Sequence, residues 1–346
     1  MGIKVLVVDD SATARAILSE ILKNDSDIQS IDTAADAYIA RDKIVKNRPD
    51  VVCLDVEMPR MDGITFLKKL MIHMPIPVVM VSSLTQKGAQ TTLDALESGA
   101  VDFIAKPHSN IYESSDEIQE ELLQKVKSAA NAKVFKRSKV GRSQQLKYNN
   151  SLSETTQKLI VIGSSTGGVE ALKAFLPQFP RNTPGMLIVQ HMPADFTKQF
   201  AQCLDSICEM DVREAKDGDT LNIGEVLLAP GDKHMVLRQF GHRYFVQLGG
   251  GKKISGHRPS VDVLFNSVSK TAGANAIGVI LTGMGSDGAK GLLNIRKSGA
   301  MTFGQDKNSC VIYGMPKVAQ EIGAVVQQNS IQELPREILQ FLENRE

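Results

Sequence analysis

Three residues in the second half of the chain have the side chains of a hydrolytic triad, and each follows an apolar, β-branched run. Ser165 follows LIVIGS, His191 follows MLIVQ, and Asp287 comes shortly after AIGVILTG. These residue types supply a nucleophile, a general base and a carboxylate that orients the base. The carboxyl ends of neighbouring parallel strands meet at one edge of a sheet, so we expect the three side chains to lie together. The pattern predicts a serine hydrolase.

Ser165 lies in a glycine-rich segment, residues 163–168, which also allows other interpretations. The segment fits the G-x-S-x-G pattern, in which a sharp turn between a strand and a helix exposes the serine hydroxyl. A glycine-rich loop at a helix N-terminus can instead bind phosphate groups. This loop lacks the lysine of a P-loop and has a serine at the second glycine position of G-x-G-x-x-G. These residues alone favour a hydrolase and leave nucleotide binding or a structural role open.

A second group of reactive residues follows apolar runs in the first half of the chain. Asp9 and Asp10 follow the first run, and Asp55 ends VVCLD. Three carboxylates at one sheet edge repel one another unless a cation joins them, and a hard divalent ion such as Mg²⁺ meets that need. An aspartate beside Mg²⁺ and a lysine can accept a phosphoryl group, because both cations offset the charge of the transition state. Lys106, after DFIA, and Ser82, at the end of PVVMVS, follow two further runs.

Two series of short apolar runs, alternating with longer amphipathic stretches, must position these residues. This alternation predicts an α/β protein with two doubly wound parallel sheets, flavodoxin-like in the first half and Rossmann-like in the second. The runs MVLRQF and RYFVQL add a β-hairpin to the second. We therefore predict one domain over residues 1–125, a basic helix end and flexible linker over 126–156, and a second domain over 157–346.

Composition narrows the class of protein. Hydrophobic residues make up 42% of the 346 positions and charged residues 23%, which excludes a disordered or fibrous chain. The net charge of +1 does not favour nucleic acid or an anionic membrane as the partner. The chain starts without a signal-peptide pattern and has no apolar run long enough to cross a bilayer. Four cysteines without CxxC pairing predict free thiols in a reducing cytoplasm.

The predicted linker carries a run of lysine and arginine with no acidic residue from Leu122 to Ser153. Its serine, asparagine and glutamine content favours a flexible tether. A nucleic-acid-binding arm is the alternative, but few aromatic side chains interleave with the charges to stack on bases.

Four segments of the first half, VLVVDDS, LDVEMPRMDG, VVMVSS and DFIAKP, together resemble the receiver domain of bacterial response regulators. The resemblance implies a Mg²⁺-dependent phosphorylation switch. The residues that take over its roles are Asp55 as phosphoacceptor, Asp9, Asp10, Asp55 and the Glu57 backbone carbonyl as Mg²⁺ ligands, Lys106 as phosphate partner, and Ser82 and Phe103 as switch residues.

Five segments of the second half resemble the catalytic domain of chemotaxis protein-glutamate methylesterases, a family that joins a receiver to this domain. The segments are IGSSTGG, IVQHMP, LAPGDKHM, GHRPSVDVLF and LTGMGSDGA. The resemblance implies Ser165, His191 and Asp287 as the triad, and Thr166 and Met284 in the oxyanion region. It implies no metal or cofactor in this domain.

Three further polar residues of these segments are Ser164, His234 and His257. Other members of the family commonly have alanine where this chain has Ser164, which creates an ambiguity between two adjacent serines; the spacing to the flanking glycines favours the second. His234 and His257 belong to loops that could edge the pocket and contact substrate. The remaining histidines are interpreted as surface residues.

The resemblance implies a phosphorylation-activated enzyme of chemotactic adaptation. Its substrates are glutamate methyl esters on membrane chemoreceptors, cleaved with release of methanol, and selected receptor glutamines, which are deamidated. Its phosphodonor is a chemotaxis histidine kinase, and its location is the cytoplasm, with recruitment to receptor clusters and no insertion into the membrane. Two other outputs stay open from the residues: a DNA-binding domain, which would explain the basic tether, and a non-catalytic receptor-binding adaptor.

Overall fold

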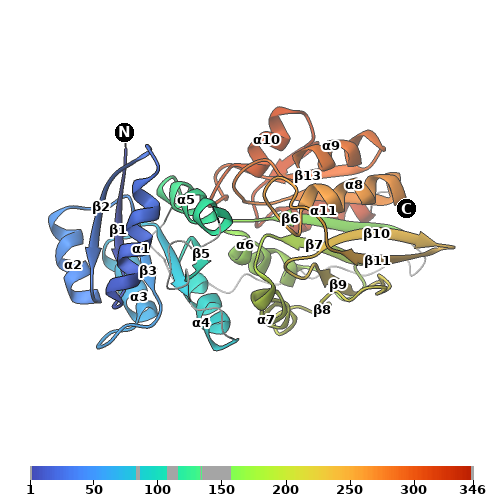
Figure 1. Ribbon diagram of the computed structural model, residues 1–346. Helices are drawn as coiled ribbons and strands as arrows, with labels where there is room; N and C mark the ends of the chain where they lie inside the picture. The colour runs from blue at the N-terminus through green and yellow to red at the C-terminus, as the bar shows by residue number, and fades with distance from the viewer. Residues whose placement is uncertain (1, 83–85, 107–115, 133, 135–156, 344–346) are drawn as a thin grey trace. The chain divides into compact units, whose positions relative to one another are not determined.

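A computed structural model describes residues 2–82, 86–106, 116–132, 134 and 157–343. The chain divides into two compact units, Met1–Arg142 and Ser143–Glu346. Each unit is an α/β fold around its own parallel sheet, which confirms the predicted fold class (Figure 1).

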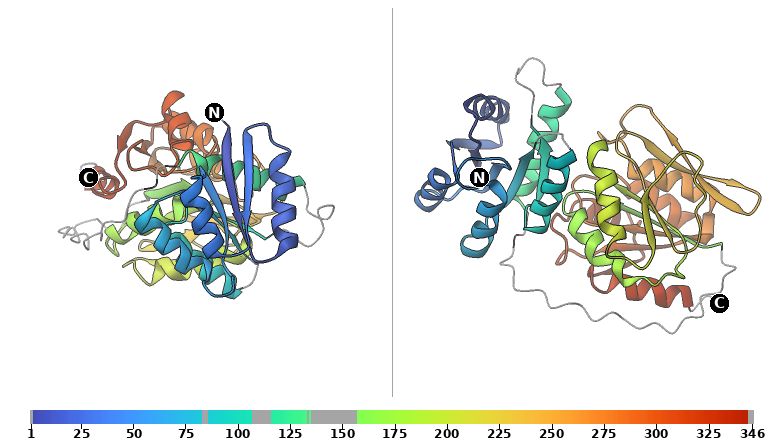
Figure 2. Two further views of the ribbon diagram at one scale, coloured as in Figure 1. Left: turned by 90° about the vertical axis from the view of Figure 1, so that its left-hand side faces the viewer. Right: turned by 90° about the horizontal axis from the view of Figure 1, so that it is seen from below.

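The first unit has a five-stranded parallel sheet in the order β2-β1-β3-β4-β5. β3 and β4 are buried along their whole length because helices cover both faces of the sheet (Figure 2), and this explains their continuous apolar sequences. The strands are β1 (Ile3–Val8), β2 (Ile28–Ala34), β3 (Val51–Asp55), β4 (Val78–Ser82) and β5 (Asp102–Ala105). The helices are α1 (Ala12–Lys23), α2 (Ala37–Lys46), α3 (Gly63–His73), α4 (Gln86–Glu97) and α5 (Asp116–Ala130).

Short polar residues begin three of these helices directly after loops at the sheet edge. The side chains of Ser11, Asp36 and Asp62 accept hydrogen bonds from the first-turn amides of α1, α2 and α3. Such caps satisfy amides that have no partner inside the helix. They therefore set where each helix begins, and Ser11 does so one residue after the Asp9 and Asp10 pair.

The start of the basic run lies in α5, which ends at Ala130 and belongs to the first unit. Lys127 Nζ lies 2.7 Å from Asp25 Oδ2 and 3.3 Å from Asp27 Oδ2. Lys125 pairs with Asp102 and with a glutamate of its own helix. These two lysines are therefore structural. Most of the predicted linker, residues 135–156, lies outside the described residues, and the domain boundaries stay a prediction.

The second unit has a seven-stranded sheet, parallel throughout, in the order β14-β13-β12-β6-β7-β9-β8. A separate antiparallel hairpin, β10 and β11, confirms the predicted addition. The strands are β6 (Leu159–Ser164), β7 (Met186–Gln190), β8 (Asp211–Glu214), β9 (Glu225–Leu228), β10 (His234–Phe240), β11 (Arg243–Gly249), β12 (Ala276–Ile280), β13 (Met301–Gln305) and β14 (Gln327–Asn329).

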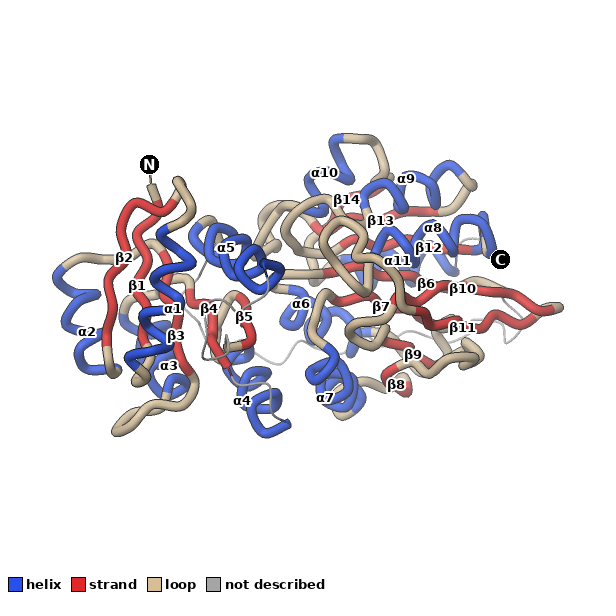
Figure 3. Tube along the Cα trace, viewed as in Figure 1, coloured by secondary structure: helices blue, strands red, loops and turns tan. Residues whose placement is uncertain are grey.

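Helices cover both faces of this sheet. Figure 3 shows α8, α9 and α10 on one side of the strands, with α6 and α7 on the other. The helices are α6 (Gly168–Phe175), α7 (Ala194–Asp205), α8 (Val261–Thr271), α9 (Ala289–Lys297), α10 (Met315–Glu321) and α11 (Leu334–Glu343), with short 3₁₀ turns η1 (Leu176–Gln178) and η2 (Gly273–Asn275). Among the described residues, no helix is both long and apolar enough to cross a membrane. The four cysteines are free thiols.

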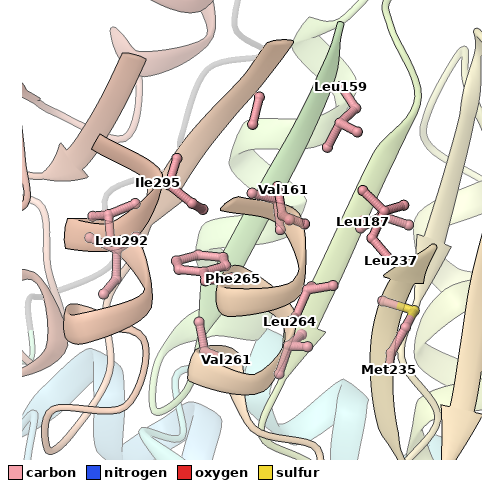
Figure 4. Packing of buried hydrophobic residues seen from close by; sticks show 14 of the residues in the cluster. Leu159, Val161, Leu187, Met235, Leu237, Val261, Leu264, Phe265, Leu292 and Ile295 are labelled. Carbon is pink, nitrogen blue, oxygen red and sulfur yellow. The ribbon is translucent and has the colours of Figure 1, made fainter. Parts of the chain in front are cut away.

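The core of the second unit holds α8 at the edge where the catalytic residues were predicted. Val261 and Phe265 of α8 pack with Leu292 of α9 over the side chains of β6 (Figure 4). A Cβ built on Gly163 would lie 2.2 Å from Cγ1 of Val261, so only glycine allows this close approach of α8 to β6. The first turn of α8 is consequently held against the end of β6.

β6 is the point at which the strand order of the second sheet reverses. Its neighbours are β7, which follows it in the chain, and β12, which is reached more than a hundred residues later. In such sheets a crevice opens at the carboxyl ends of the strands beside the reversal. The loops after β6, β7 and β12 therefore meet at this crevice.

Candidate functional site

The three predicted triad residues come from these three loops and form a continuous hydrogen-bonded series. Ser165 directly follows β6, His191 directly follows β7, and Asp287 lies in the loop between β12 and α9. His191 Nδ1 is 3.1 Å from Ser165 Oγ. His191 Nε2 is 2.9 Å from Asp287 Oδ2. All three residues are at least partly buried, and Asp287 is only 2% exposed.

The two nitrogens of His191 have distinct roles in this series. A carboxylate can only accept hydrogen bonds, so Nε2 carries a proton and donates a hydrogen bond to Asp287. Nδ1 is then left with its lone pair toward the Ser165 hydroxyl. Burial alone would raise the pKa of Asp287, but hydrogen bonds and charge from His191, together with backbone amides, lower it below its ordinary value. The arrangement keeps a carboxylate charged beside the imidazole.

The N-terminus of α8 holds Asp287. Ser260 Oγ donates to Asp287 Oδ1 at 2.8 Å, and the Val261 amide donates to Oδ2 at 2.7 Å. The Asp262 amide donates to Oδ1 at 3.1 Å. The partial positive charge of a helix N-terminus adds to this stabilisation of the anion. Sequence reasoning missed Ser260, although a serine directly before the apolar run VDVLF is a recognisable helix-start signal.

Ser164 and Ser165 differ in their partners. Ser164 is completely buried, and its Oγ donates to Gln190 Oε1 at 2.7 Å. Gln190 Nε2 in turn donates to the carbonyls of Ser165 and His191, at 3.0 and 3.1 Å. The Ser164 hydroxyl is thus used inside the protein, and the geometry favours Ser165 as the nucleophile. Gln190, which ties together the main chains of both reactive residues, was also missed from the sequence.

The residues predicted for the oxyanion region lie close to Ser165 in the backbone. The Ser165 amide donates to the Thr282 carbonyl at 3.0 Å, and Thr282 Oγ1 donates to the Thr166 carbonyl at 3.0 Å. Gly283 packs directly on the serine, because a Cβ built there would lie 2.8 Å from Ser165 Cβ. Met284 follows this glycine. The oxyanion roles of Thr166 and Met284 stay predictions.

The two loop histidines singled out in the sequence have different surroundings. The ring of His257 stacks on that of His191, with ring centroids 3.7 Å apart and 13° between the planes. His234 is buried, its Nε2 is 3.0 Å from the Lys252 carbonyl, and its Nδ1 accepts from the Ser260 amide at 3.2 Å. The stack thus brings His257 against a triad side chain. A substrate contact for either histidine stays a prediction.

In the first unit, the structure brings together the three predicted acidic ligands. Asp9, Asp10 and Asp55 place one carboxylate oxygen each within 4.8 Å of one another. Lys106 Nζ lies 2.8 Å from Asp9 Oδ2 and 3.0 Å from Asp55 Oδ2. Asp9 and Asp55 are buried, whereas Asp10 is exposed.

The charge in this pocket is only partly offset by the protein. Burial raises the pKa of Asp55 to about 6, and the charge of Asp9 adds to the rise against the lowering by Lys106. The Glu57 backbone also hydrogen-bonds to Asp55 and lowers its pKa. A donor set made only of oxygens, with excess negative charge, suits a hard divalent cation such as Mg²⁺. The residues present therefore fit the predicted ion.

The predicted switch residues belong to the strands β4 and β5 beside this pocket. Ser82 is the buried last residue of β4, and its carbonyl accepts from the Lys106 amide at 2.8 Å. Phe103 in β5 is buried, and Lys125 Nζ lies 5.1 Å from its ring centroid. Sequence reasoning missed Arg15, whose Nη1 donates to the carbonyl of Asp9 at 2.7 Å and so fixes the acidic loop.

Two protein families match the chain. The family described as CheB methylesterase matches residues 160–338, and the response regulator receiver domain matches residues 5–114.

Individual proteins are similar over nearly the whole chain. A protein-glutamate methylesterase/protein-glutamine glutaminase of Sulfurimonas denitrificans is 60% identical and covers 94% of each chain. One of Syntrophotalea carbinolica is 51% identical over 99% of this chain and 98% of its own. The crystal structure of the Thermotoga maritima CheB methylesterase catalytic domain is 39% identical, with a TM-score of 0.52, and covers 53% of this chain and 98% of that domain.

Proposed function

The chain belongs to the CheB methylesterase family, and on this premise we propose that Ser165, His191 and Asp287 perform its catalysis. Its activities are hydrolysis of protein glutamate methyl esters and deamidation of protein glutamines, in a chain that also contains a receiver domain. The proposed residue roles depend on one observation. Hydrogen bonds join Ser165 Oγ to His191 Nδ1 and His191 Nε2 to Asp287 Oδ2, at the point where the strand order of the sheet reverses.

The first half of the proposed reaction forms an ester between substrate and enzyme. Ser165 Oγ attacks the carbonyl carbon of the glutamate methyl ester while its proton moves to His191 Nδ1. Asp287 stabilises the resulting imidazolium through Nε2. As the tetrahedral intermediate collapses, Nδ1 returns the proton to the leaving group, which departs as methanol, or as ammonia when the substrate is a glutamine.

The second half of the reaction regenerates the enzyme. Water attacks the glutamyl ester on Ser165 and gives its proton to His191 Nδ1. The serine oxygen then leaves with that proton, and the free glutamate carboxylate is released. This sequence needs no metal in the second unit, because the imidazole handles every proton and the backbone stabilises the oxyanion.

The proposed oxyanion donors are the backbone amides of Thr166 and Met284. Thr166 follows the nucleophile directly, and Met284 follows the glycine that packs against Ser165. Preorganised amides stabilise the negative oxygen of the tetrahedral intermediate more than the neutral carbonyl of the substrate.

The proposed control site is Asp55, phosphorylated by a chemotaxis histidine kinase. One oxygen of its carboxylate attacks the phosphorus of the kinase's phosphohistidine, the N–P bond breaks with the kinase imidazole as the leaving group, and Lys106 offsets charge on the transferred group. Asp9, Asp10, Asp55 and the Glu57 carbonyl would hold Mg²⁺, which when bound neutralises charge on the phosphoryl oxygens.

The proposed response to phosphorylation uses the residues beside Asp55. The Ser82 hydroxyl, at the end of the adjacent strand, would hydrogen-bond the phosphoryl group, and Phe103 would change its packing. The rise in hydrolase activity then follows from a shift between two states of the receiver domain. The proposal places the enzyme in the cytoplasm, recruited to clusters of chemoreceptors that are its substrates.

Methanol release from methylated receptor membranes tests the assignment. We expect Ser165→Ala to lower the rate by several orders of magnitude, since removing the nucleophile of such a triad costs on the order of 10⁶ in kcat. Ser164→Ala is the matched control, because it removes the adjacent hydroxyl. Near-normal release by Ser165→Ala, or a larger loss with Ser164→Ala, would reject Ser165 as the nucleophile.

A further inference from the structure

We propose that His257 is a positioning residue for the catalytic base, whose ring it holds from one face. The inference rests on the proposed function, in which His191 accepts the proton of Ser165. The two imidazoles are stacked, with 3.7 Å between their centroids and planes that are 13° apart. This spacing is van der Waals contact over most of both rings.

The two hydrogen bonds of His191 restrain its ring incompletely. They join Nδ1 to Ser165 Oγ and Nε2 to Asp287 Oδ2, at two points on the ring. The ring is also attached at Cγ, but its two side-chain torsions can change together, so the ring can still tilt about the line through these two points while both bonds persist. A flat ring packed parallel to its face blocks this motion. The stack therefore restrains the tilt of the ring, which the side-chain torsions and the two hydrogen bonds leave partly free.

The backbone around His257 is itself anchored on both sides. Its amide and carbonyl form a reciprocal pair with those of Ile254, each hydrogen bond measuring 3.0 Å. The next residue, Arg258, binds Asp232 through its guanidinium and also donates to the carbonyl of Gly251. The loop thus presents His257 from a closed turn.

The same loop continues into the residues that hold the carboxylate of the triad. Three residues after His257, Ser260 caps α8 and donates its hydroxyl to Asp287 Oδ1. The Ser260 amide donates to His234 Nδ1, which fixes this end of the loop as well. One segment, residues 254–262, therefore sets both the ring face and the carboxylate against His191, so the base is positioned by a single continuous support.

The stack also suits the charge that His191 acquires during the reaction. A cation is attracted to the face of an aromatic ring, and the attraction grows when water is excluded. Only 7% of the His191 side chain is exposed. With an uncharged ring, His257 favours the imidazolium while it keeps Nδ1 aimed at the serine hydroxyl.

Substitutions that separate ring shape from volume test the proposal in the full-length protein. His257→Phe keeps a flat ring, His257→Leu keeps a similar bulk without one, and His257→Ala removes both. We expect the Ala and Leu variants to lose about tenfold or more in kcat for methanol release with KM within about twofold, because misplacing a catalytic group by 1 Å can cost 10²-fold. Phe should recover most of the loss. His242→Ala, in the hairpin turn, is the control and should match wild type.

Whether the His257 variants change kcat or KM distinguishes a positioning role from a substrate contact. A loss confined to KM would overturn the proposal in favour of a substrate contact. Equal activity of the Phe and Leu variants, or unchanged kcat in the Ala variant, would overturn it as well. If the Ala variant unfolds in a thermal melt, the comparison of Phe with Leu still decides.

A second measurement tests the role of His257 without using the proposed substrate. A fluorophosphonate reacts with an activated serine by forming an Oγ–P bond and releasing fluoride, with no need for a glutamate ester. We expect Ser165 labelling, followed by mass spectrometry, to slow in the order wild type, Phe, Leu. If labelling slows in this order but no methanol is released, the proposed substrate is wrong and the positioning role stands. If wild type and the Phe and Leu variants are labelled at equal rates, the positioning role is wrong.

Discussion

Asp55 and Asp287 are both buried aspartates at the carboxyl edge of a parallel sheet, yet their electrostatic environments are opposite. Burial and the Asp9 carboxylate raise the pKa of Asp55 to about 6. At Asp287, the hydrogen bonds and charge of His191 and two amides of α8 overcome the effect of burial, so its pKa is lowered. At the first site, the single positive charge of Lys106 only partly offsets the carboxylates, whereas the carboxylate at the second site is fully hydrogen-bonded by its own chain.

This difference shows how one type of sheet edge serves two kinds of chemistry. A carboxylate whose charge is not fully offset is ready to recruit a cation and to accept a phosphoryl group. A carboxylate that is completely hydrogen-bonded stays ionised and can orient a base through many turnovers. The same substitution, aspartate to asparagine, should therefore have different consequences at the two positions.

The largest expected effect is on catalysis at Asp287. Asparagine offers an amide nitrogen or oxygen to Nε2 in place of a carboxylate, which disturbs the tautomer of His191 and removes the charge that stabilises the imidazolium. We expect Asp287→Asn to lower kcat for methanol release on the order of 10⁴-fold. Steady-state assays on methylated receptor membranes measure this, with a thermal melt as the folding control. A loss below tenfold would mean that Asp287 is not the orienting carboxylate.

The equivalent change at Asp55 should leave basal hydrolysis unchanged and abolish its activation. Asp55→Asn has no carboxylate to form an acyl phosphate, so a small phosphodonor with Mg²⁺ should not stimulate it. We expect wild type to respond by about tenfold, a coupling within the usual 1–3 kcal/mol range. Phosphate incorporation and methanol release are measured on the same samples. If the variant responds as strongly as wild type, Asp55 is not the control site.

Stability should also respond with opposite signs. The folded pKa of Asp55 is raised from 3.8 to about 6, so its ionisation destabilises the fold as pH increases through this window. With screening allowed for, Asp55→Asn should stabilise the first unit by about 1 kcal/mol at pH 7.5 without Mg²⁺, and the gain should shrink toward pH 4.

At Asp287 the folded pKa is lowered, so its charge stabilises the fold at every pH above the ordinary aspartate value. Asp287→Asn should destabilise the second unit by about 1–3 kcal/mol, equally at pH 7.5 and pH 5. Hydrogen exchange in β3 and β12 reports on the two units separately. Changes of the same sign at both positions would refute the contrast.

The smallest expected effect concerns the serine beside the nucleophile. Ser164→Ala leaves Gln190 Oε1 without its hydroxyl donor, and an unsatisfied buried acceptor costs about 1 kcal/mol or more. Because Gln190 also holds the carbonyls of Ser165 and His191, we expect kcat to fall by a few-fold. Active-site titration with a fluorophosphonate should still label one serine per chain; loss of labelling would point to Ser164.

Much of the architecture follows from patterns readable in the sequence. Apolar β-branched runs separated by amphipathic stretches predicted both sheets and the hairpin, and the structure confirms them. The matches also confirm the predicted family. Residue types at strand ends indicated Ser165, His191 and Asp287, because strand ends of a parallel sheet converge; the catalytic roles themselves stay predictions.

The residues that escaped sequence reasoning support the reactive ones. Ser260 and Gln190 belong to no reactive residue pattern, because a single serine or glutamine makes such bonds only when folding brings a partner to it. Lys125 and Lys127 were noted in the sequence only as members of a run of positive charge, whereas packing of α5 pairs both with acidic residues. Local sequence does not encode these distances.

The sequence alone determined the class of each sheet, the family and the chemical types available at each edge, since these depend on periodicity and residue identity. Tertiary structure decided which nitrogen of His191 faces Ser165, that His257 stacks on its ring, and that two buried aspartates have opposite pKa shifts. These properties depend on distances of a few ångströms between segments far apart in the chain, which only the packing of strands and helices sets.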